Sequence, residues 1–237
     1  MNQAPSTKNE EPRASAPRTA LVTGGARGIG AAIAAELTSA GCRVVAPTRS
    51  ELDLASPASI EAWVAANSGL AVDILVNNAG INVLRALPEI ETAGWAAMVQ
   101  TNLSAPLRLI QALAPGMAAR GWGRILNVSS IFSLVTKERR AAYSMTKAAL
   151  NALTRSAAVE YGPAGVLVNS LAPGYVDTAL TRQNNPPEVI AALAGAIPLR
   201  RLAQPAELAR TAAFLVSEAN TYLTGQTIVV DGGFTCL

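Results

Sequence analysis

Short apolar runs alternate along this chain with longer segments in which Ala and Leu recur at helical spacing. Runs rich in Val, Ile and Leu that end in Gly, Pro, Asn or Ser are typical of buried strands, and segments with a period near 3.6 are typical of the helices that cover them. The predicted strands are residues 19–23, 43–48, 72–76, 124–129, 167–171 and 227–230, with a short seventh at 52–54. The predicted helices are residues 29–40, 57–66, 95–119, 142–161 and 205–217.

This alternation predicts the α/β class, with a Rossmann-like, doubly wound, seven-stranded parallel sheet in a single domain. Two element ends carry local signals. Ser56 and Pro57 supply a helix N-cap and first turn, and Gly41 stops the helix that ends at Ala40. The chain has 237 residues, half of them hydrophobic, which is enough for one large core.

The first 17 residues are rich in Pro, Ser, Lys and Glu and lack the apolar stretch of a secretory signal. We expect a disordered tail at residues 1–17 and a folded domain at residues 18–237. No apolar run approaches the ~20 residues that span a bilayer. The two cysteines, Cys42 and Cys236, are compatible with a reducing compartment, so we expect a cytoplasmic protein with no membrane partner.

Composition excludes several kinds of chemistry. The net charge is +3 and the pI is near 9.1, but the basic residues are scattered and form no stripe on a predicted helix, so nucleic acid is not an expected partner. The chain has no histidine, which excludes histidine-dependent triads and zinc sites that use imidazole, and two cysteines are too few for a cysteine zinc site. No metal is expected, and a general acid has to be Tyr, Lys, Cys or a carboxyl group.

The segment TGGARGIG at residues 23–30 lies where the first strand turns into the first helix. Gly24, Gly28 and Gly30 allow a tight turn and let backbone N–H groups approach a pyrophosphate, whose charge suits the positive helix N-terminus. An ordinary βα turn is the alternative interpretation. A second turn, NNAG at residues 77–80, places small residues at the carboxyl end of another strand, the edge where open α/β sheets bind ligands.

Tyr143 and Lys147 are four residues apart and share one helix face. A phenol with a pKa near 10 is a poor base at neutral pH, but a neighbouring ammonium stabilises its phenolate. A half-buried Tyr beside a solvated Lys is the alternative. Ser130, at the end of a predicted strand, offers a hydroxyl for a substrate carbonyl, and Asn102 is a polar residue inside a long predicted helix, where it indicates a kink or a water anchor.

The motifs TGGARGIG, NNAG, VSS, YSMTK and APGYVDT, together with Asn102, resemble in order and spacing those of the compact short-chain dehydrogenase/reductase family, over about residues 19–233. The resemblance implies a dinucleotide-binding catalytic domain that transfers a hydride between NADP(H) and an alcohol/carbonyl pair. Ser130, Tyr143 and Lys147 would be the catalytic triad, with Asn102 completing a proton relay through water. In this scheme Tyr143 protonates the carbonyl oxygen during reduction and Ser130 orients it. The family's serine-to-tyrosine interval selects Ser130 over Ser129.

The resemblance and the glycine-rich turn together imply a set of cofactor-binding residues. The expected set is Gly24, Arg27, Gly28, Ile29, Gly30, Arg49, Ser50, Asp53, Leu54, Asn78, Ala79, Gly80, Tyr143, Lys147, Pro173, Gly174, Val176 and Thr178. In this set Asp53 resembles the residue that contacts adenine, and Lys147 also holds the nicotinamide ribose.

The choice between NADP(H) and NAD(H) depends on the end of the second strand. Thr48 stands where an acid would select NAD, and Arg49, Ser50 and Arg27 are placed to surround the extra phosphate of NADP. Glu51 is near enough in sequence to neutralise one arginine. The residues therefore predict NADP(H), with NAD(H) as the alternative.

Two connections are expected to shape the ends of the ligand site. Only residues 49–52 separate the end of the second strand from Asp53, where members of the resembling family commonly insert a helix, so one flank of the sheet is expected to be exposed. Residues 177–201 are expected to form a substrate lid with a mobile, non-helical bend at NNPP, residues 184–187. Asp177 is expected to be the N-cap of the helix that opens this lid.

The small-molecule substrate stays open between a 3-oxoacyl thioester and a small ketone, and the general resemblance is to 3-oxoacyl-acyl-carrier-protein reductases. Enoyl reductases resemble this chain less, because they space Tyr and Lys more widely. Lys137, Arg139 and Arg140 either attract an acidic substrate or an acyl carrier, or form a solvated charged loop.

Apolar residues on more than one face of the helices at 95–119 and 142–161, together with the resemblance, predict a homotetramer, with a dimer as the alternative. A nucleotide-binding redox sensor or structural protein without turnover is the alternative function.

Overall fold

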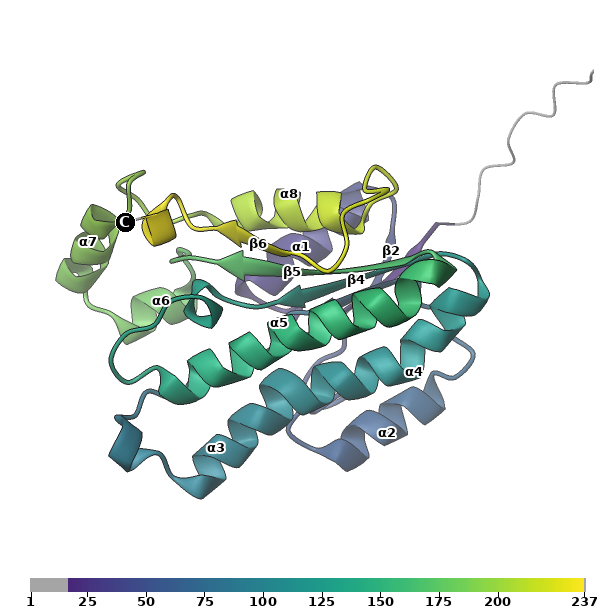
Figure 1. The fold of residues 1–237 in the computed structure, drawn as a ribbon, viewed down its shortest axis with the longest axis horizontal. Helices are drawn as coiled ribbons and strands as arrows, with labels where there is room; N and C mark the ends of the chain where they lie inside the picture. Colours follow the sequence, from purple (N-terminus) through teal and green to yellow (C-terminus); the bar gives the residue numbers. More distant parts are fainter. Residues whose placement is uncertain (1–16, 237) are drawn as a thin grey trace, which may run out of the picture.

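A parallel sheet of six strands runs through the centre of the molecule (Figure 1). The computed structural model describes residues 17–236. The strands, in the order in which they lie side by side, are β2 (Arg43–Val45), β1 (Thr19–Val22), β3 (Ile74–Asn77), β4 (Gly123–Val128), β5 (Val166–Pro173) and β6 (Thr227–Val230). The strand order changes direction between β1 and β3, so the carboxyl ends of these two strands flank the crevice in which doubly wound sheets bind ligands. The predicted Rossmann-like α/β fold is confirmed.

Both faces of the sheet are apolar, and successive side chains divide between them. On β1, Leu21 belongs to one core cluster, whereas Ala20 and Val22 belong to the other. Leu75 and Val76 on β3 divide in the same way, and all five side chains are completely buried. The strands therefore appear in the sequence as continuous apolar runs, as expected for a sheet covered on both sides.

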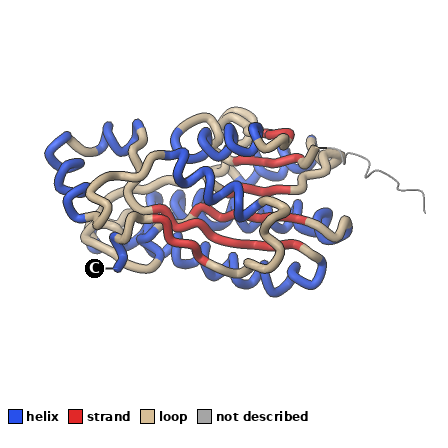
Figure 2. The backbone as a smooth tube through the Cα atoms, turned by 90° about the horizontal axis from the view of Figure 1, so that it is seen from above, coloured by secondary structure: helices blue, strands red, loops and turns tan. Residues whose placement is uncertain are grey.

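Helices cover the two faces in separate layers. The helices α1 (Gly28–Ser39) and α8 (Pro205–Val216) pack on one face, and α2 (Pro57–Ala66), α4 (Ala105–Ala119) and α5 (Ala141–Tyr161) pack on the other (Figure 1). Figure 2 shows the strands lying side by side between these helices. The arrowheads of β4, β5 and β6 in Figure 1 point toward α6 (Ala179–Asn184) and α7 (Pro187–Ala196), so this pair lies at the carboxyl edge of the sheet.

The prediction of a seventh strand at residues 52–54 is wrong, because in the described part of the chain this segment is not a strand. The segment forms a turn, and Leu52 and Leu54 are 5% and 7% exposed because they pack into the core beside α2. A strand parallel to β2 has to begin at the opposite edge of the sheet, which takes a crossover of a dozen or more residues. Six residues, 46–51, lie between β2 and Leu52, so the crossover cannot form. Among the described residues β2 is an edge strand, in agreement with the predicted exposed flank.

The long helix predicted at residues 95–119 begins earlier and is interrupted. It consists of α3 (Thr92–Val99), a π-helical turn at Gln100–Ser104, and α4. Asn102 lies in the π-helical turn, which is a local widening of the helix that is common at functional sites. The irregularity that this polar residue predicted is therefore present.

The segment after β5 differs from the prediction in two details. The non-helical bend is limited to residues 185–186, because Pro187 begins α7 and a proline is favourable in the first helical turn. Thr178, and not Asp177, is the N-cap of α6, since Thr178 Oγ1 accepts a hydrogen bond from Thr181 N at 3.2 Å. Asp177 instead pairs with Arg182 at 2.6 Å, because its side chain lies one residue too early to reach the helix N–H groups.

The element ends predicted from local signals are in place. Gly41 has φ of +85° and follows the last residues of α1, and Ser56 Oγ accepts from Ser59 N at 3.2 Å at the start of α2.

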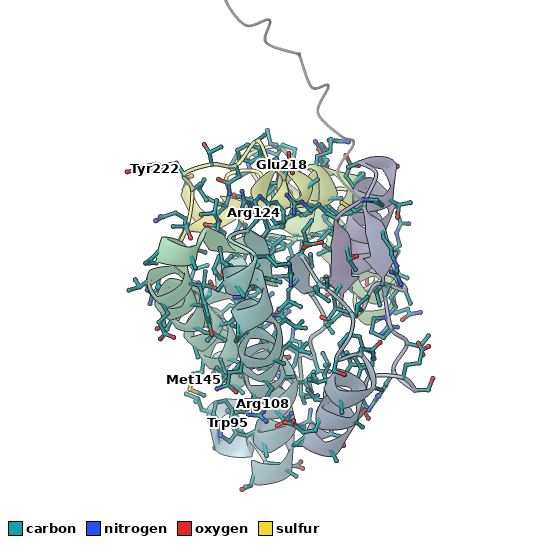
Figure 3. The ribbon with its side chains drawn as sticks, turned by 90° about the vertical axis from the view of Figure 1, so that its right-hand side faces the viewer. Trp95, Arg108, Arg124, Met145, Glu218 and Tyr222 are labelled. Carbon is teal, nitrogen blue, oxygen red and sulfur yellow. The ribbon has the colours of Figure 1, made fainter. Side chains whose placement is uncertain are left out.

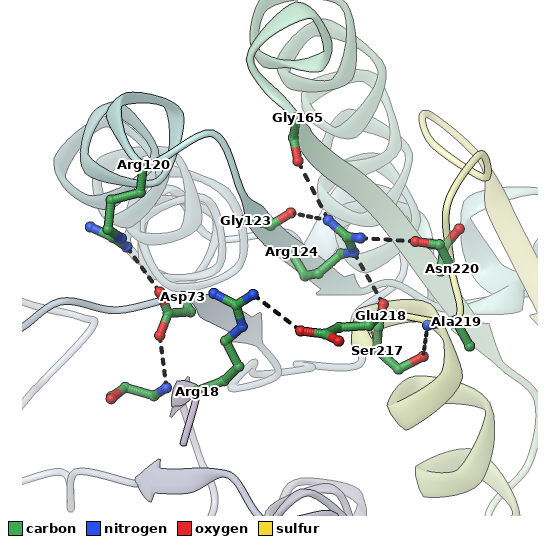
Figure 4. A network of polar contacts seen from close by, with 11 residues as sticks. Arg18, Asp73, Arg120, Gly123, Arg124, Gly165, Ser217, Glu218, Ala219 and Asn220 are labelled. Atoms are coloured by element: carbon green, nitrogen blue, oxygen red, sulfur yellow. Dashed lines mark hydrogen bonds and ion pairs between the residues drawn. The ribbon is translucent and has the colours of Figure 1, made fainter. Parts of the chain in front are cut away.

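Arg124 ties together the opposite, amino-terminal edge of the sheet (Figure 4). Its side chain is 5% exposed and donates hydrogen bonds to the backbone carbonyl oxygens of Gly123, Gly165, Ser217 and Asn220. These carbonyls come from β4 itself and from two separate connections, so one guanidinium links β4, the turn before β5 and the segment after α8.

No helix within residues 17–236 combines the length and the apolar character needed to cross a membrane. In the same range, no three Cys, Asp or Glu side chains converge as metal ligands would.

Candidate active site

The glycine loop between β1 and α1 has the backbone conformation that its sequence predicts. Gly24 and Gly28 have φ of +65° and +57°, in the left-handed region that favours glycine. A Cβ at Gly30 would overlap the Gly24 carbonyl oxygen, so a larger residue does not fit there. The first turn of α1 contains no acid, and the Arg27 side chain does not cap it. The first backbone N–H groups of α1 are therefore free to bind an anion.

Asn78 joins this loop to the end of β3. Its Nδ2 donates to the Thr23 and Gly24 carbonyl oxygens at 2.9 and 3.2 Å. Thr23 Oγ1 in turn accepts from the backbone N–H groups of Asn78 and Ala79 at 3.0 and 3.1 Å. The two turns singled out in the sequence therefore form one rigid unit. Thr23 had no role assigned from the sequence, and its position at the end of a strand just before the glycines was the available signal.

The segment after β5 lies on the other side of the glycine loop. Thr178 Cγ2 is 3.5 Å from the position that a Cβ would take at Gly28. Gly174 lies so close to the end of β6 that a Cβ there would be 2.7 Å from Asp231 Cα. Val176 forms a bridge with Ala203. Residues 173–178 are thus held against the carboxyl edge of the sheet, beside the turn that precedes α1.

Asn102 is 1% exposed, and its amide group holds the backbone that follows the NNAG turn. Asn102 Oδ1 accepts from Ile81 N at 2.8 Å, and Nδ2 donates to the Ile81 carbonyl oxygen at 2.8 Å and to Thr146 Oγ1 at 3.1 Å. Because Thr146 precedes Lys147 in α5, the amide connects the π-helical turn, the end of β3 and the helix that carries Tyr143.

Lys147 is a buried cation at the floor of the site. It is 4% exposed, and Nζ donates to the Val128 carbonyl oxygen at 2.7 Å. Burial lowers the pKa of Lys147 to about 8, because removing an ammonium from water penalises its charged form. Gly80 passes directly over it, since a Cβ at Gly80 would lie 3.5 Å from Lys147 Nζ and 3.2 Å from Asn102 Oδ1.

Tyr143 lies one helical turn before Lys147, whose Nζ is 5.8 Å from the centre of the phenol ring. Burial raises the pKa of Tyr143, while a hydrogen bond with the Ser130 side chain and the charge of Arg140 act in the opposite direction. Tyr143 is therefore protonated at neutral pH and has a proton to donate. Ser130 is 7% exposed, and its Oγ also accepts from Phe132 N at 3.2 Å.

Ser129, the competitor of Ser130, faces away from Tyr143. Its hydroxyl donates to the Lys147 carbonyl oxygen at 3.3 Å, and its backbone N–H donates to the Leu171 carbonyl oxygen at 2.7 Å. Both groups are used to hold α5 and β5 against β4, so Ser130 is the hydroxyl that accompanies Tyr143.

The end of β2 lies next to the glycine loop, since a Cβ at Gly25 would be 2.8 Å from Ala46 Cβ. Glu51 folds back here and accepts hydrogen bonds from Thr48 N and Thr48 Oγ1 at 2.7 and 2.8 Å, which lowers the pKa of its carboxyl group. Arg49 Nε lies 3.4 Å from Asp53 Oδ1, so the acid that pairs with Arg49 is Asp53 and not Glu51. The acid expected to neutralise an arginine therefore caps a turn instead.

The remaining residues of the expected cofactor set lie in different surroundings. Arg27 is exposed at the start of α1, and Ser50 Oγ lies 2.9 Å from Thr48 Oγ1. Ile29 packs against the core, and the Leu54 side chain is buried in it, while the Leu54 carbonyl oxygen accepts from Gln100 Nε2 at 3.0 Å.

Two models of known families match this arrangement of residues. A family model described as Enoyl-(Acyl carrier protein) reductase matches residues 46–235, and one described as short chain dehydrogenase matches residues 18–62. The chain belongs to the short-chain dehydrogenase/reductase family. Its similarity to members of this family extends over nearly its whole length. A 3-oxoacyl-[acyl-carrier-protein] reductase of Vibrio cholerae is 37% identical, with 91% of this chain and 96% of that protein covered.

Solved structures of the family show the same similarity. A gluconate 5-dehydrogenase from Burkholderia cenocepacia, described in complex with NADP and tartrate, has a TM-score of 0.88 at 34% identity and covers 93% of this chain and 96% of its own. Among the sequence relatives, an acetoacetyl-CoA reductase of Allochromatium vinosum is 35% identical over 91% of this chain and 98% of its own length. Members of the family with different named substrates are thus about equally similar to this chain.

Proposed function

We propose that this chain is an NADP(H)-dependent oxidoreductase that interconverts an alcohol and the corresponding carbonyl compound. The observation that supports it most is the presence, at one edge of the sheet, of Ser130 and Tyr143 above the buried Lys147. The open first turn of α1 lies at the same edge and suits a pyrophosphate. The two relatives named as 3-oxoacyl and acetoacetyl thioester reductases, and the NADP named for the Burkholderia structure, agree with this proposal.

In the proposed reaction Tyr143 is the general acid and Ser130 orients the substrate. Tyr143 donates its proton to the carbonyl oxygen during reduction, and the Ser130 hydroxyl hydrogen-bonds the same oxygen. Lys147 stabilises the phenolate that remains, because its ammonium lies close to the ring in surroundings of low polarity. Asn102 would order the water through which the proton is replaced. The nicotinamide, when bound, supplies or accepts the hydride.

The residues of the site fit a dinucleotide. The glycine loop and the first N–H groups of α1 would hold the pyrophosphate, Asp53 the adenine, Lys147 the nicotinamide ribose, and residues 173–178 the carboxamide. Arg27, Arg49 and Ser50 would bind the 2′-phosphate of NADP. The ion pair between Arg49 and Asp53 does not prevent Arg49 from binding the phosphate. The Arg49 side chain is 82% exposed, and a solvent-exposed ion pair adds little stability that would have to be given up.

Carbonyl reduction fits the four-residue spacing of Tyr143 and Lys147 better than enoyl reduction, although one matching family model carries the enoyl description. Tyr143 and Lys147 are one helical turn apart, the interval of the carbonyl-reducing members that the chain resembles. We propose residues 177–201, with α6 and α7, as the substrate lid, since this segment follows β5 at the carboxyl edge.

We further propose a cytoplasmic homotetramer. The faces of α4 and α5 that point away from the sheet keep large apolar side chains in water, with Leu107 37%, Met145 49% and Val159 78% exposed. Figure 3 shows Met145 on the same side of the molecule as Trp95 and Arg108. Contact between copies of the chain would cover these side chains.

The experiment that tests the function follows NADPH consumption with a panel of ketones and 3-oxoacyl thioesters, in both reaction directions. Tyr143→Phe is the matched control, because it removes one hydroxyl and keeps the ring. We expect turnover by the wild type and a loss of about 10²–10⁴ in kcat for the variant, with cofactor affinity nearly unchanged. Retention of more than a tenth of the wild-type activity would exclude Tyr143 as the acid.

The alternative function, nucleotide binding without turnover, predicts a different result. In that case the chain would bind NADPH tightly and convert no member of the panel in either direction. The presence of Ser130, Tyr143, Lys147 and Asn102 in one connected arrangement is the reason to prefer the enzyme.

A further inference from the structure

Arg140 is a cation without an acidic partner among the described residues, and it lies at the substrate side of the proposed active site. It immediately precedes α5, three residues before Tyr143, and the two side chains are close enough for the charge of Arg140 to lower the pKa of the phenol. The guanidinium is partly buried, and its Nε is fully enclosed without a hydrogen-bond partner. Among residues 17–236 it enters none of the ion pairs. A guanidinium has five N–H donors, and enclosing even one of them, here Nε–H, without an acceptor is unfavourable.

The surroundings of Arg140 are aromatic. Its Cζ lies 4.8 Å from the centre of the Phe132 ring, and Phe132 follows Ser130 by two residues. The Phe132 and Tyr175 rings meet edge to face with their centres 6.2 Å apart, and the Tyr175 and Phe234 rings do so with their centres 5.3 Å apart. Lys137 adds a second cation, with Nζ 5.6 Å from the centre of the Tyr175 ring. Two cations thus lie against a row of rings whose first member, Phe132, donates its backbone N–H to Ser130 Oγ.

The loop that carries these cations contains one acid, Glu138, which is exposed and pairs with neither of them in the described part of the chain. Arg139 is also exposed, so it fits the solvated charged loop that the sequence left open as an interpretation. Arg140 does not fit that interpretation, because it is half-buried beside Phe132 and its Nε is enclosed.

We propose, resting on the proposed oxidoreductase function, that Arg140 binds a carboxylate of the substrate itself, so that the enzyme acts on oxo acids and the corresponding hydroxy acids. A guanidinium presents a planar fork that matches a carboxylate, and the aromatic row supplies an apolar wall for the carbon skeleton. Lys137 attracts the same anion from the rim. The phosphate of an acyl-carrier arm is separated from its thioester by the whole pantetheine chain, so it does not reach a guanidinium next to the reacting carbonyl.

The test compares each of a series of oxo acids with its methyl ester, in the wild type and in Arg140→Gln. The measured quantity is the ratio of kcat/KM for the acid to that for the ester, which cancels any effect of the substitution on folding, cofactor binding or the pKa of Tyr143. We expect the wild type to favour at least one acid over its ester tenfold or more. We expect Arg140→Gln to lower that ratio at least tenfold, a difference of about 1.4 kcal/mol.

Arg139→Gln is the control for general electrostatic attraction, because Arg139 is the exposed neighbour in the same loop. It should change the ratio less than threefold. A wild type that reduces the esters, or a neutral 3-oxoacyl thioester, as well as every acid overturns the carboxylate proposal and leaves the oxidoreductase intact. An unchanged ratio in Arg140→Gln also overturns it. Failure to convert any acid, ester or thioester with either cofactor overturns the proposed function as well.

Discussion

Lys147 shows at the scale of one residue how the fold changes the chemistry of a side chain. Its ammonium is enclosed beside the Val128 carbonyl oxygen and Gly80, and its pKa falls to about 8 from the usual value near 10.5. Between these two values the unfolded chain binds the proton and the folded chain does not. Stability therefore rises with pH across this window, because the cost of burying the ammonium, about 3 kcal/mol below pH 8, disappears as the group loses its proton.

This linkage predicts a pH-dependent difference between the wild type and Lys147→Met. We expect the free energy of unfolding of the wild type, relative to the variant, to increase between pH 8 and 10, because only the wild type carries the group that titrates there. Urea titrations of the cofactor-free proteins at several pH values measure it. Parallel pH profiles for the two proteins would show that Lys147 keeps an ordinary pKa.

Arg49 and Glu51 are expected to influence cofactor choice in opposite directions. The wild type should use NADPH at least tenfold better than NADH by kcat/KM, about 1.4 kcal/mol in the transition state. Arg49→Asp should erase or invert this preference, since it replaces attraction of the 2′-phosphate by repulsion. Glu51→Gln should increase it, because the amide still accepts a hydrogen bond from Thr48 N but no longer carries a negative charge.

Steady-state kinetics with both cofactors measure these preferences, and the NADH reaction is the internal control because NADH has no 2′-phosphate. Equal use of both cofactors by the wild type, or an unchanged preference in Arg49→Asp, would mean that the phosphate is not recognised at the end of β2.

At the scale of elements, Arg124 shows how a cation can be buried without a carboxylate. Four backbone carbonyl oxygens surround its guanidinium at the amino-terminal edge of the sheet (Figure 4). Arg124→Met fills similar space but leaves these carbonyls without a donor. We expect it to lower the free energy of unfolding by about 3 kcal/mol, measured by chemical denaturation.

Arg18→Met is the matched control for Arg124→Met. Arg18 pairs with Glu218 near the same edge, but its side chain is 36% exposed and that of Glu218 70%, so the expected loss is below about 1 kcal/mol. Affinity for NADPH should stay the same in both variants, because the glycine loop lies at the opposite edge of the sheet. Equal destabilisation by the two substitutions would contradict the role assigned to Arg124.

At the scale of the whole molecule, the proposed assembly leads to a direct measurement. Light scattering at micromolar concentration should give four times the mass of the 24.4 kDa chain. Val159→Glu should dissociate the tetramer, since a charge on the outer face of α5 would be buried without a partner. Leu87→Glu, at a side chain 71% exposed outside α4 and α5, should leave the mass unchanged. A monomeric wild type would disprove the proposed tetramer.

The strand and helix order was predictable from the sequence, because a sheet covered on both faces needs strands such as β1 and β3 to be continuously apolar. The glycine loop was also predictable, since Gly24 and Gly28 adopt conformations that depend on the chain within a few residues. The pairing of Tyr143 with Lys147 on one face follows from helix geometry alone. Their roles, like those of Ser130 and Asn102, stay predictions until turnover is measured.

Tertiary structure decided those features that depend on what the fold brings together. Leu52 and Leu54 have the pattern of a strand, but the short connection after β2 sends them into the core. Arg139 and Arg140 look alike along the chain, and only packing against Phe132 separates a solvated cation from an enclosed one. Burial and partnership depend on distant residues, and local spacing does not encode them.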